Sequence, residues 1–131
     1  MKLLGVAVGG ALGALLRWWL GEAFPDHTGF PWTTFAINVT GSGLLAALPA
    51  IAAVRRRPGL AATLGPGVLG GYTTLSAYSE QTRALLADDR LATGAAYVLG
   101  TLVACVVVVA VISHATTRPE QDEFAAEGGD E

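Results

Sequence analysis

The chain has 131 residues, of which 52% are hydrophobic and 15% charged, and its mean hydropathy is +0.49. Its single cysteine, Cys105, excludes an internal disulfide and has no neighbouring residues at metal-ligand spacing. Six of the eleven acidic residues lie in the last twelve positions, whereas residues 1–117 hold seven basic and five acidic side chains, a net charge of +2.

Four long apolar stretches follow one another along the chain, and a helix needs roughly 20 residues to cross the hydrocarbon of a bilayer. Arg17 and two tryptophans follow the first stretch where a signal peptide would have its cleavage site. The sequence therefore predicts an all-α, multi-pass protein of the cell membrane with no room for a catalytic domain, and not an enzyme. The predicted helices cover residues 3–21, 31–54, 60–86 and 91–113 within one domain, 1–117.

The first stretch carries glycines at helical spacing. Gly5, Gly9 and Gly13 form two overlapping G-x-x-x-G units, which let helix backbones approach closely in lipid. Arg17, near the end of the same stretch, is a candidate site residue. The alternative for Arg17 is that it snorkels to the membrane interface beside the tryptophans.

The second stretch carries a line of polar residues. Thr34, Asn38 and Ser42 lie at i, i+4 and i+8, so they share one face of a helix. An amide in hydrocarbon must be hydrogen-bonded to protein or face water. The line therefore indicates either contacts between helices, worth about 0.6 kcal/mol each, or a pore or binding cavity, and the pattern favours the cavity.

The third stretch is poorly suited to a continuous helix. It places Gly65, Pro66, Gly67, Gly70 and Gly71 just before Tyr72-Thr73-Thr74. We expect an unwound backbone there, and at membrane depth such a backbone is tolerated only when buried in protein or lining an aqueous cavity. Its free carbonyls would be able to coordinate a cation.

The charges predict the orientation. Both termini and the loop 54–60 lie on one side of a four-span protein, with five basic residues against two on the other side, so both termini are predicted to be cytoplasmic. The final segment, 118–131, is acidic, nearly free of apolar residues, and predicted to be disordered. The basic residues of the predicted cytoplasmic side are Lys2, Arg55, Arg56, Arg57 and Arg118.

Three segments, GGALGALLRWW, TTFAINVTGSGLL and GVLGGYTTLSAYS, occur in this order over residues 3–113. Together they resemble the CrcB/Fluc family of fluoride channels. The resemblance implies two four-helix subunits, inverted relative to each other, that form two antiparallel fluoride pores around a structural sodium ion.

The resemblance also assigns roles to individual residues. It implies that Asn38 lines the pore, with Thr34 one turn before it, and that Thr101 stands for a serine of the fourth helix. It implies a helix break from Gly70 to Thr74, in which the backbone carbonyls of Gly70 and Thr73 hold the sodium ion.

This chain departs from the family's TTFSTFS motif, whose two phenylalanines present ring edges to the anion. Leu75 and Tyr78 take their places, and Ser76 adds a hydroxyl beside them. An aromatic edge carries partial positive charge and a leucine has no such edge, so one of the two aromatic positions is missing here. A carboxylate expected after the motif falls on Gln81, with Glu80 one position earlier.

The leading hypothesis is a passive fluoride channel that lets the anion leave the cytoplasm and so lowers fluoride toxicity. The membrane potential, about 2.3 kcal/mol per charge per 100 mV, suffices to drive it, and no nucleotide or redox motif is present. One alternative is a non-conducting subunit that completes a partner's pore. Another is a small four-helix multidrug-type exporter, which would need a carboxylate within a span, and only Glu80 qualifies.

The loop charges also bear on the partner. Because Arg55–Arg57 fill a short loop, this chain should insert in one orientation only. An antiparallel dimer then needs a homologous partner with its termini outside the cell. We therefore expect an obligate heterodimer in membrane lipid, with no nucleic-acid partner.

Overall fold

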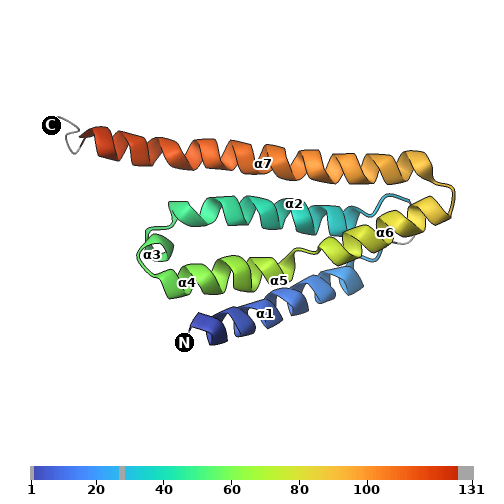
Figure 1. Cartoon of the computed structure of the whole chain (residues 1–131), viewed down its shortest axis with the longest axis horizontal. Coiled ribbons are helices and arrows are strands. Elements are labelled where there is room, and N and C mark those ends of the chain that lie inside the picture. Colours follow the sequence, from blue (N-terminus) through green and yellow to red (C-terminus); the bar gives the residue numbers. More distant parts are fainter. Residues whose placement is uncertain (1, 27–28, 127–131) are drawn as a thin grey trace.

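The structure is a computed structural model that describes residues 2–26 and 29–126, and the side chains as far as Thr116. All regular elements in these ranges are helices (Figure 1). The start of α1 (Lys2–Ala23) and the end of α7 (Leu91–Ala126) lie at the same end of the molecule. Two segments, Lys2–Ala23 and Leu91–Thr116, are long and apolar enough to cross a membrane.

The second predicted helix is divided in the structure. It consists of α2 (Trp32–Ala47), a 3₁₀ turn η1 (Leu48–Ala50) and the short helix α3 (Ala52–Arg55). Pro49 lies at the start of the 3₁₀ turn and Ile51 is extended. A proline removes a backbone donor and clashes with the preceding turn, so the helix changes direction here and does not run straight to residue 54.

The third predicted helix is divided too, but its break is shorter than expected. It consists of α4 (Pro58–Ala62), a π-helical segment η2 (Thr63–Leu69), α5 (Gly70–Tyr72) and α6 (Leu75–Ala87). Only Thr73 and Thr74 have extended backbones, with ψ of 158° and 119°, whereas Gly70 is helical. The prediction of a break beginning at Gly70 is therefore wrong. The π-helical segment accommodates Pro66 without unwinding the chain.

The glycines of this region serve close packing. α1 lies along η2 and α5, and a methyl group at Gly13 would overlap the Val68 carbonyl oxygen. A methyl group at Gly71 would likewise overlap the carbonyl of Gly10. The predicted role of the first-stretch glycines in close helix packing is confirmed.

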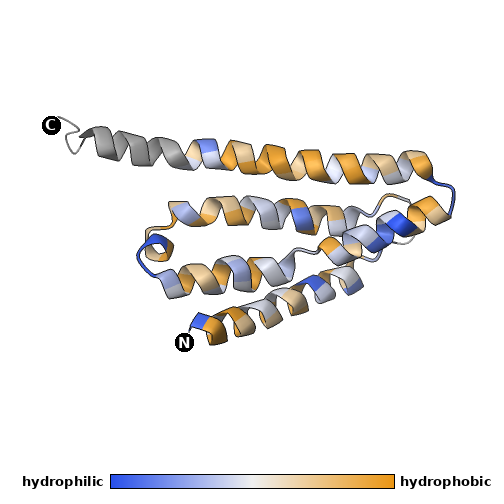
Figure 2. Cartoon of the chain, in the orientation of Figure 1, coloured by the Kyte–Doolittle hydropathy of each residue, from blue (hydrophilic) through white to orange (hydrophobic). Residues whose placement is uncertain are grey.

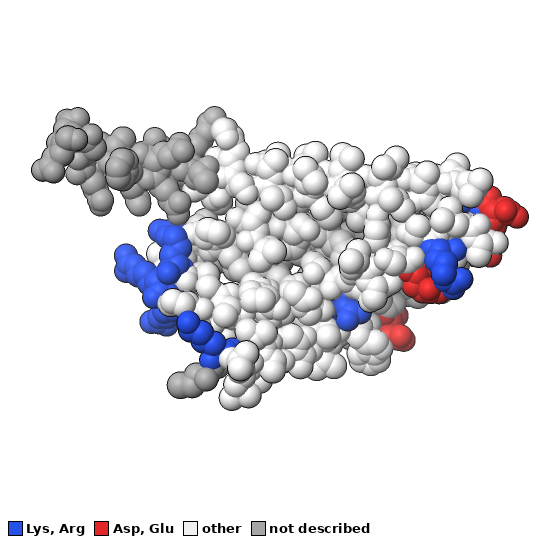
Figure 3. All heavy atoms as spheres, in the orientation of Figure 1, with Lys and Arg blue, Asp and Glu red and all other residues white. Residues whose placement is uncertain are grey.

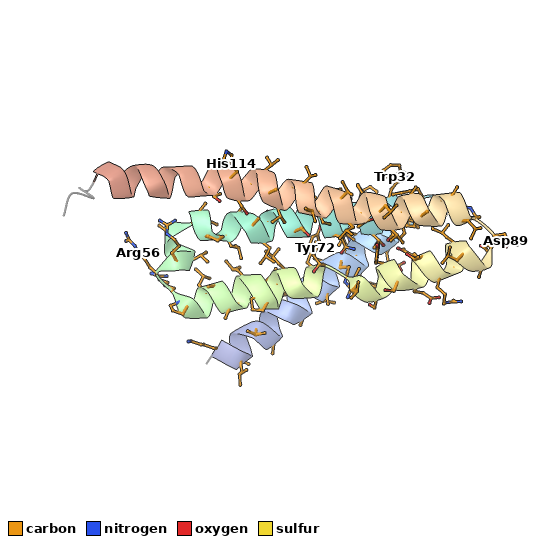
Figure 4. The ribbon with its side chains drawn as sticks, turned by 45° about the horizontal axis from the view of Figure 1, so that its top comes forward. Trp32, Arg56, Tyr72, Asp89 and His114 are labelled. Carbon is orange, nitrogen blue, oxygen red and sulfur yellow. The ribbon has the colours of Figure 1, made fainter. Side chains whose placement is uncertain are left out.

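The surface of the bundle is apolar between two charged ends. Large apolar side chains are exposed along the helices, for example Leu3 at 86% and Val111 at 62% (Figure 2). A cluster of lysine and arginine lies at the end that holds α3, whereas the described acidic side chains lie toward the opposite end, where other basic side chains accompany them (Figure 3). Arg56 and Asp89 mark these two ends (Figure 4). This distribution is typical of a helical membrane protein.

α7 is longer than the predicted fourth span. Its backbone is helical to Ala126, past the predicted end at residue 113, and includes residues 118–126 of the tail that the sequence predicts to be disordered. Glutamate, glutamine and alanine are strong helix formers, and an existing helix extends without a nucleation cost. The remaining residues of the predicted tail, 127–131, lie outside the described residues.

Candidate functional site

An open groove of about 550 Å³ lies between α2, α7 and the segment that joins α5 to α6. It brings together residues from the second, third and fourth predicted spans. Its polar lining residues are Asn38, Ser42, Thr73, Thr74, Tyr78 and Thr101, and Gly70, Leu75, Leu102 and Cys105 are among the others.

Asn38 forms a pair of hydrogen bonds with the extended break. Its Nδ2 donates to the Thr74 carbonyl at 3.0 Å, and the Thr74 N–H donates to Oδ1 at 2.8 Å. The two groups of Thr74 point sideways because its backbone is extended, with φ of −146° and ψ of 119°. The amide of α2 therefore replaces the hydrogen bonds that a continuous helix would have made at this position.

Arg17 holds the same break from another helix. Its Nε donates to the Gly71 carbonyl at 3.2 Å, and the side chain is partly buried. Carbonyls at the C-terminal end of a helix favour a positive charge, and α5 ends one residue later. Of the two sequence interpretations of Arg17, the structure favours a role at the break over snorkelling to the interface.

The hydroxyl of Thr101 is buried without a hydrogen-bond partner among the described residues. The residue is only 4% exposed. A buried polar group without a partner costs about 1–3 kcal/mol. A hydrogen-bond acceptor bound in the groove would remove this cost.

The two replaced aromatic positions lie in the groove but differ in their surroundings. The Tyr78 hydroxyl donates to the Val98 carbonyl of α7 at 3.0 Å, so its ring is fixed between α6 and α7. Leu75 is 76% exposed and packs against little else in the chain. One of these positions is therefore ordered within the subunit, whereas the other faces outward.

Three predicted site residues lie outside the groove lining: Arg17, Thr34 and Ser76. Thr34 is buried in α2, beyond the groove toward Tyr97. Ser76 is exposed on α6, and its hydroxyl lies 3.2 Å from that of Thr74. The structure brings together the other predicted side chains and the Gly70–Thr73 backbone.

The backbone carbonyls fit the ligand type of a hard cation, which takes oxygen ligands. Gly70 and Thr73 both line the groove, and the N–H that would bond the Gly70 carbonyl in a continuing helix, that of Thr74, is given to Asn38. The described residues contain no group of three or more histidine, cysteine or acidic side chains suited to a metal.

The sequence interpretation named Thr101 but missed Tyr97, which forms a second polar line with it on α7. Tyr97 and Thr101 are four residues apart on one face, the spacing that pointed to Asn38 in α2. Tyr97 is fully buried, and its hydroxyl donates to Gln81 Oε1 at 2.8 Å. Its ring lies 5.1 Å from that of Tyr78, so it supports the aromatic wall of the groove.

Among the residues that the structure describes, no acidic side chain lines the groove. Glu80 lies on the exposed surface of α6 and forms a two-bond ion pair with Arg83, the shorter contact being 2.6 Å. The carboxylate that a cation exporter would need is therefore turned away from the groove.

Comparison with known proteins identifies the family. Residues 4–112 match the family model described as CrcB-like protein, Camphor Resistance (CrcB). The chain belongs to the CrcB family. It is 40% identical over 116 residues to fluoride-specific ion channel FluC 1 of Streptomyces coelicolor, covering 86% of this chain and 75% of the relative.

Other relatives of this CrcB-family chain carry similar names. It is 43% identical to fluoride-specific ion channel FluC of Nitrobacter winogradskyi, covering 77% of this chain and 83% of the relative. It is 41% identical to fluoride-specific ion channel FluC 2 of Nocardia farcinica, covering 78% and 75%. These relatives are named as ion channels, which are not enzymes.

Proposed function

We propose that this chain is a subunit of a fluoride-selective channel that lets fluoride leave the cytoplasm passively. The proposal is carried by the unpaired hydroxyl of Thr101 at a groove whose described lining has no acidic side chain. The chain is also similar to proteins named fluoride-specific ion channels. Fluoride is small and strongly hydrated, so a selective path must replace its water with donors at close range. Thr101 and Asn38 supply such donors, and the Tyr78 ring can turn a positive edge toward the anion.

The charge distribution supports the proposed orientation. We assign four spans with both termini in the cytoplasm, because basic side chains gather at the end that holds α3 (Figure 3). Exposed tryptophans near the opposite end, such as Trp18 and Trp32, suit the membrane interface. The channel would then lie in the plasma membrane.

The open groove supports the proposed partner. Residues of this one chain line the groove on one side and leave it open on the other. Leu75, which lines it, is largely exposed. A homologous subunit inserted the other way would complete the pore. Relatives named FluC 1 and FluC 2 favour paired gene products. Five basic residues on the side of the termini, against two on the other side, favour a single orientation and hence a heterodimer.

A structural sodium ion belongs to the same proposal. Each subunit would contribute the carbonyls of Gly70 and Thr73, so an inverted pair would surround the ion with oxygen ligands from both chains. When bound, the ion would hold the two breaks together by electrostatic attraction.

Fluoride efflux from proteoliposomes tests the proposed function. Vesicles loaded with potassium fluoride and carrying this chain, alone and with a co-encoded homologue, should release fluoride when valinomycin supplies the counter-ion pathway. Vesicles loaded with chloride should not. Absence of fluoride release in both preparations would sink the proposal.

A second candidate function is a non-conducting subunit that completes a partner's pore. The exposed leucine at position 75, in place of an aromatic ring, favours it. Leu75→Phe distinguishes the two candidates in the same vesicles. If both pores already conduct, the variant changes the efflux rate by less than twofold; if one pore is silent, it raises the rate about twofold.

A further inference from the structure

The side-chain amide of Asn38 has one orientation that fits its surroundings. Its oxygen and nitrogen are similar in shape, and a free amide can present either to a ligand. Here the Thr74 N–H faces Oδ1 at 2.8 Å and the Thr74 carbonyl faces Nδ2 at 3.0 Å. A flipped amide would oppose donor to donor and acceptor to acceptor, so the backbone of Thr74 fixes the orientation.

The break that fixes the amide is itself held at both ends. Arg17 of α1 donates to the Gly71 carbonyl just before the break. After the break, the Thr74 hydroxyl accepts from the Ala77 N–H at 3.1 Å and caps α6. Contacts from α1 and α2 and the cap of α6 therefore hold the break, so that Thr74 stays extended and pairs with the amide of Asn38.

The pairing of Asn38 with Thr74 leaves one N–H of the side-chain amide available. Asn38 lines the groove, and within the described residues Nδ2 donates only to Thr74. A primary amide has two N–H protons, so one of them stays available while Oδ1 is turned toward the break. Asn38 thus offers the groove an N–H donor, whereas its Oδ1, the acceptor that a cation would need, is paired with Thr74.

We propose that the Thr73–Thr74 break is an orientation lock that makes Asn38 a dedicated anion donor. Thr74 is then a positioning residue for selectivity through its backbone, without touching the anion. This inference rests on the proposed function, because it takes fluoride as the anion. In the proposed function the helix break supplies carbonyl ligands to a sodium ion. The inference gives the break a second role, in anion selectivity.

The chain offers a direct test because Asn38 is its only asparagine. Full-length protein labelled with ¹⁵N in asparagine alone, in lipid nanodiscs with and without its partner, gives one side-chain NH₂ group by NMR. We expect two distinct proton signals, one of which shifts on addition of sodium fluoride. Neither should shift with sodium chloride at the same concentration. Two protons that respond equally to fluoride would overturn the lock.

A backbone ester at position 74 provides the matched variant, because it replaces the Thr74 N–H by oxygen and keeps the side chain. We expect both amide protons to respond to fluoride and fluoride efflux to fall about tenfold, the factor for one lost hydrogen bond. The same ester at Thr82, in α6 away from the groove, should leave the spectrum and the efflux unchanged. An ester at position 74 without effect on the spectrum contradicts the inference.

The two readouts separate this inference from the proposed function. Normal fluoride efflux with two amide protons that respond equally to fluoride means that the function stands and the lock fails. Two distinct protons with neither efflux nor a fluoride-specific shift mean that the proposed function fails and that the lock does not serve fluoride.

Discussion

At the scale of single residues, Thr101 is the observation on which the proposed fluoride path depends. Its hydroxyl is buried without a partner among the described residues, while neighbouring polar groups of the groove are paired: Asn38 with Thr74, and Tyr78 with Val98. The fold satisfies these neighbouring polar groups and leaves the Thr101 hydroxyl without a partner, which fits the proposal that a bound anion accepts its hydrogen bond.

Replacing this hydroxyl separates function from stability. Thr101→Val keeps the shape and removes an unsatisfied polar group, so the free energy of unfolding should stay the same or rise by about 1 kcal/mol. Fluoride efflux should fall about tenfold, because one donor is lost. Thr101→Ser, which keeps the hydroxyl, is the control. Loss of stability together with unchanged efflux would show that the hydroxyl serves only the fold.

Helical spacing alone singled out Asn38, through its line with Thr34 and Ser42. It did not give the pairing with Thr74, because that residue is 36 positions away and its backbone groups are available only when extended. Spacing likewise does not show that Thr34 lies outside the groove, since this depends on where α7 crosses α2.

At the scale of helices, the contact between α1 and the divided third helix decides the architecture. In lipid, hydrophobicity gives no net attraction between helices, so close backbone packing must supply it. The glycines of η2 and α5 face those of α1, and their backbones meet where larger residues would collide. This explains why so many glycines are tolerated within helices.

Gly13→Ala tests this contact. The added methyl group would meet the backbone of Val68 and Tyr72, so we expect a loss of about 1–3 kcal/mol in the free energy of unfolding. Gly21→Ala, in the same helix with nothing within 4 Å, should be neutral or slightly stabilising. Unfolding in mixed detergent micelles measures both. Equal stability of the two variants would refute the packing account.

Arg17 provides a second test at this scale. Arg17→Met removes the donor to Gly71 while keeping an apolar side chain, and should cost about 1.5–3 kcal/mol, the value for a hydrogen bond to a charged group. Arg17→Lys keeps the charge near the end of α5 and should lose less than the methionine variant. If the lysine and methionine variants are equally stable, Arg17 does not support the break.

The position of the break was only partly predictable from the sequence. Glycine and proline in η2 suggested unwinding from Gly70, but a π-helical segment absorbs them and Asn38 fixes the extended residues at Thr73–Thr74. Local propensity identifies a weak helix, and a tertiary partner decides where it opens.

For the whole molecule, the separation of charge defines two ends. Arginines near α3 and acidic residues at the opposite end lie across an apolar band (Figure 3). The sequence predicted this polarity and the helical class, because both depend on composition along the chain. It did not predict the helical backbone of 118–126, which continues from α7.

The orientation can be mapped with a membrane-impermeant thiol reagent. In a Cys105→Ala background, Asp88→Cys should react from outside intact cells and Ala53→Cys should react only after permeabilisation. Both positions are exposed, at opposite ends of the bundle. Equal labelling of the two cysteines in intact cells would show dual insertion and argue against an obligate heterodimer.

The zero-current potential across a planar bilayer tests fluoride conduction most directly. With this chain and its partner in the bilayer and a tenfold gradient of sodium fluoride, a fluoride-selective pore should give about 59 mV, with the sign of an anion. A tenfold gradient of sodium chloride under symmetric fluoride should give a potential near zero. A potential that follows chloride, or one with the sign of a sodium pathway, would contradict the account.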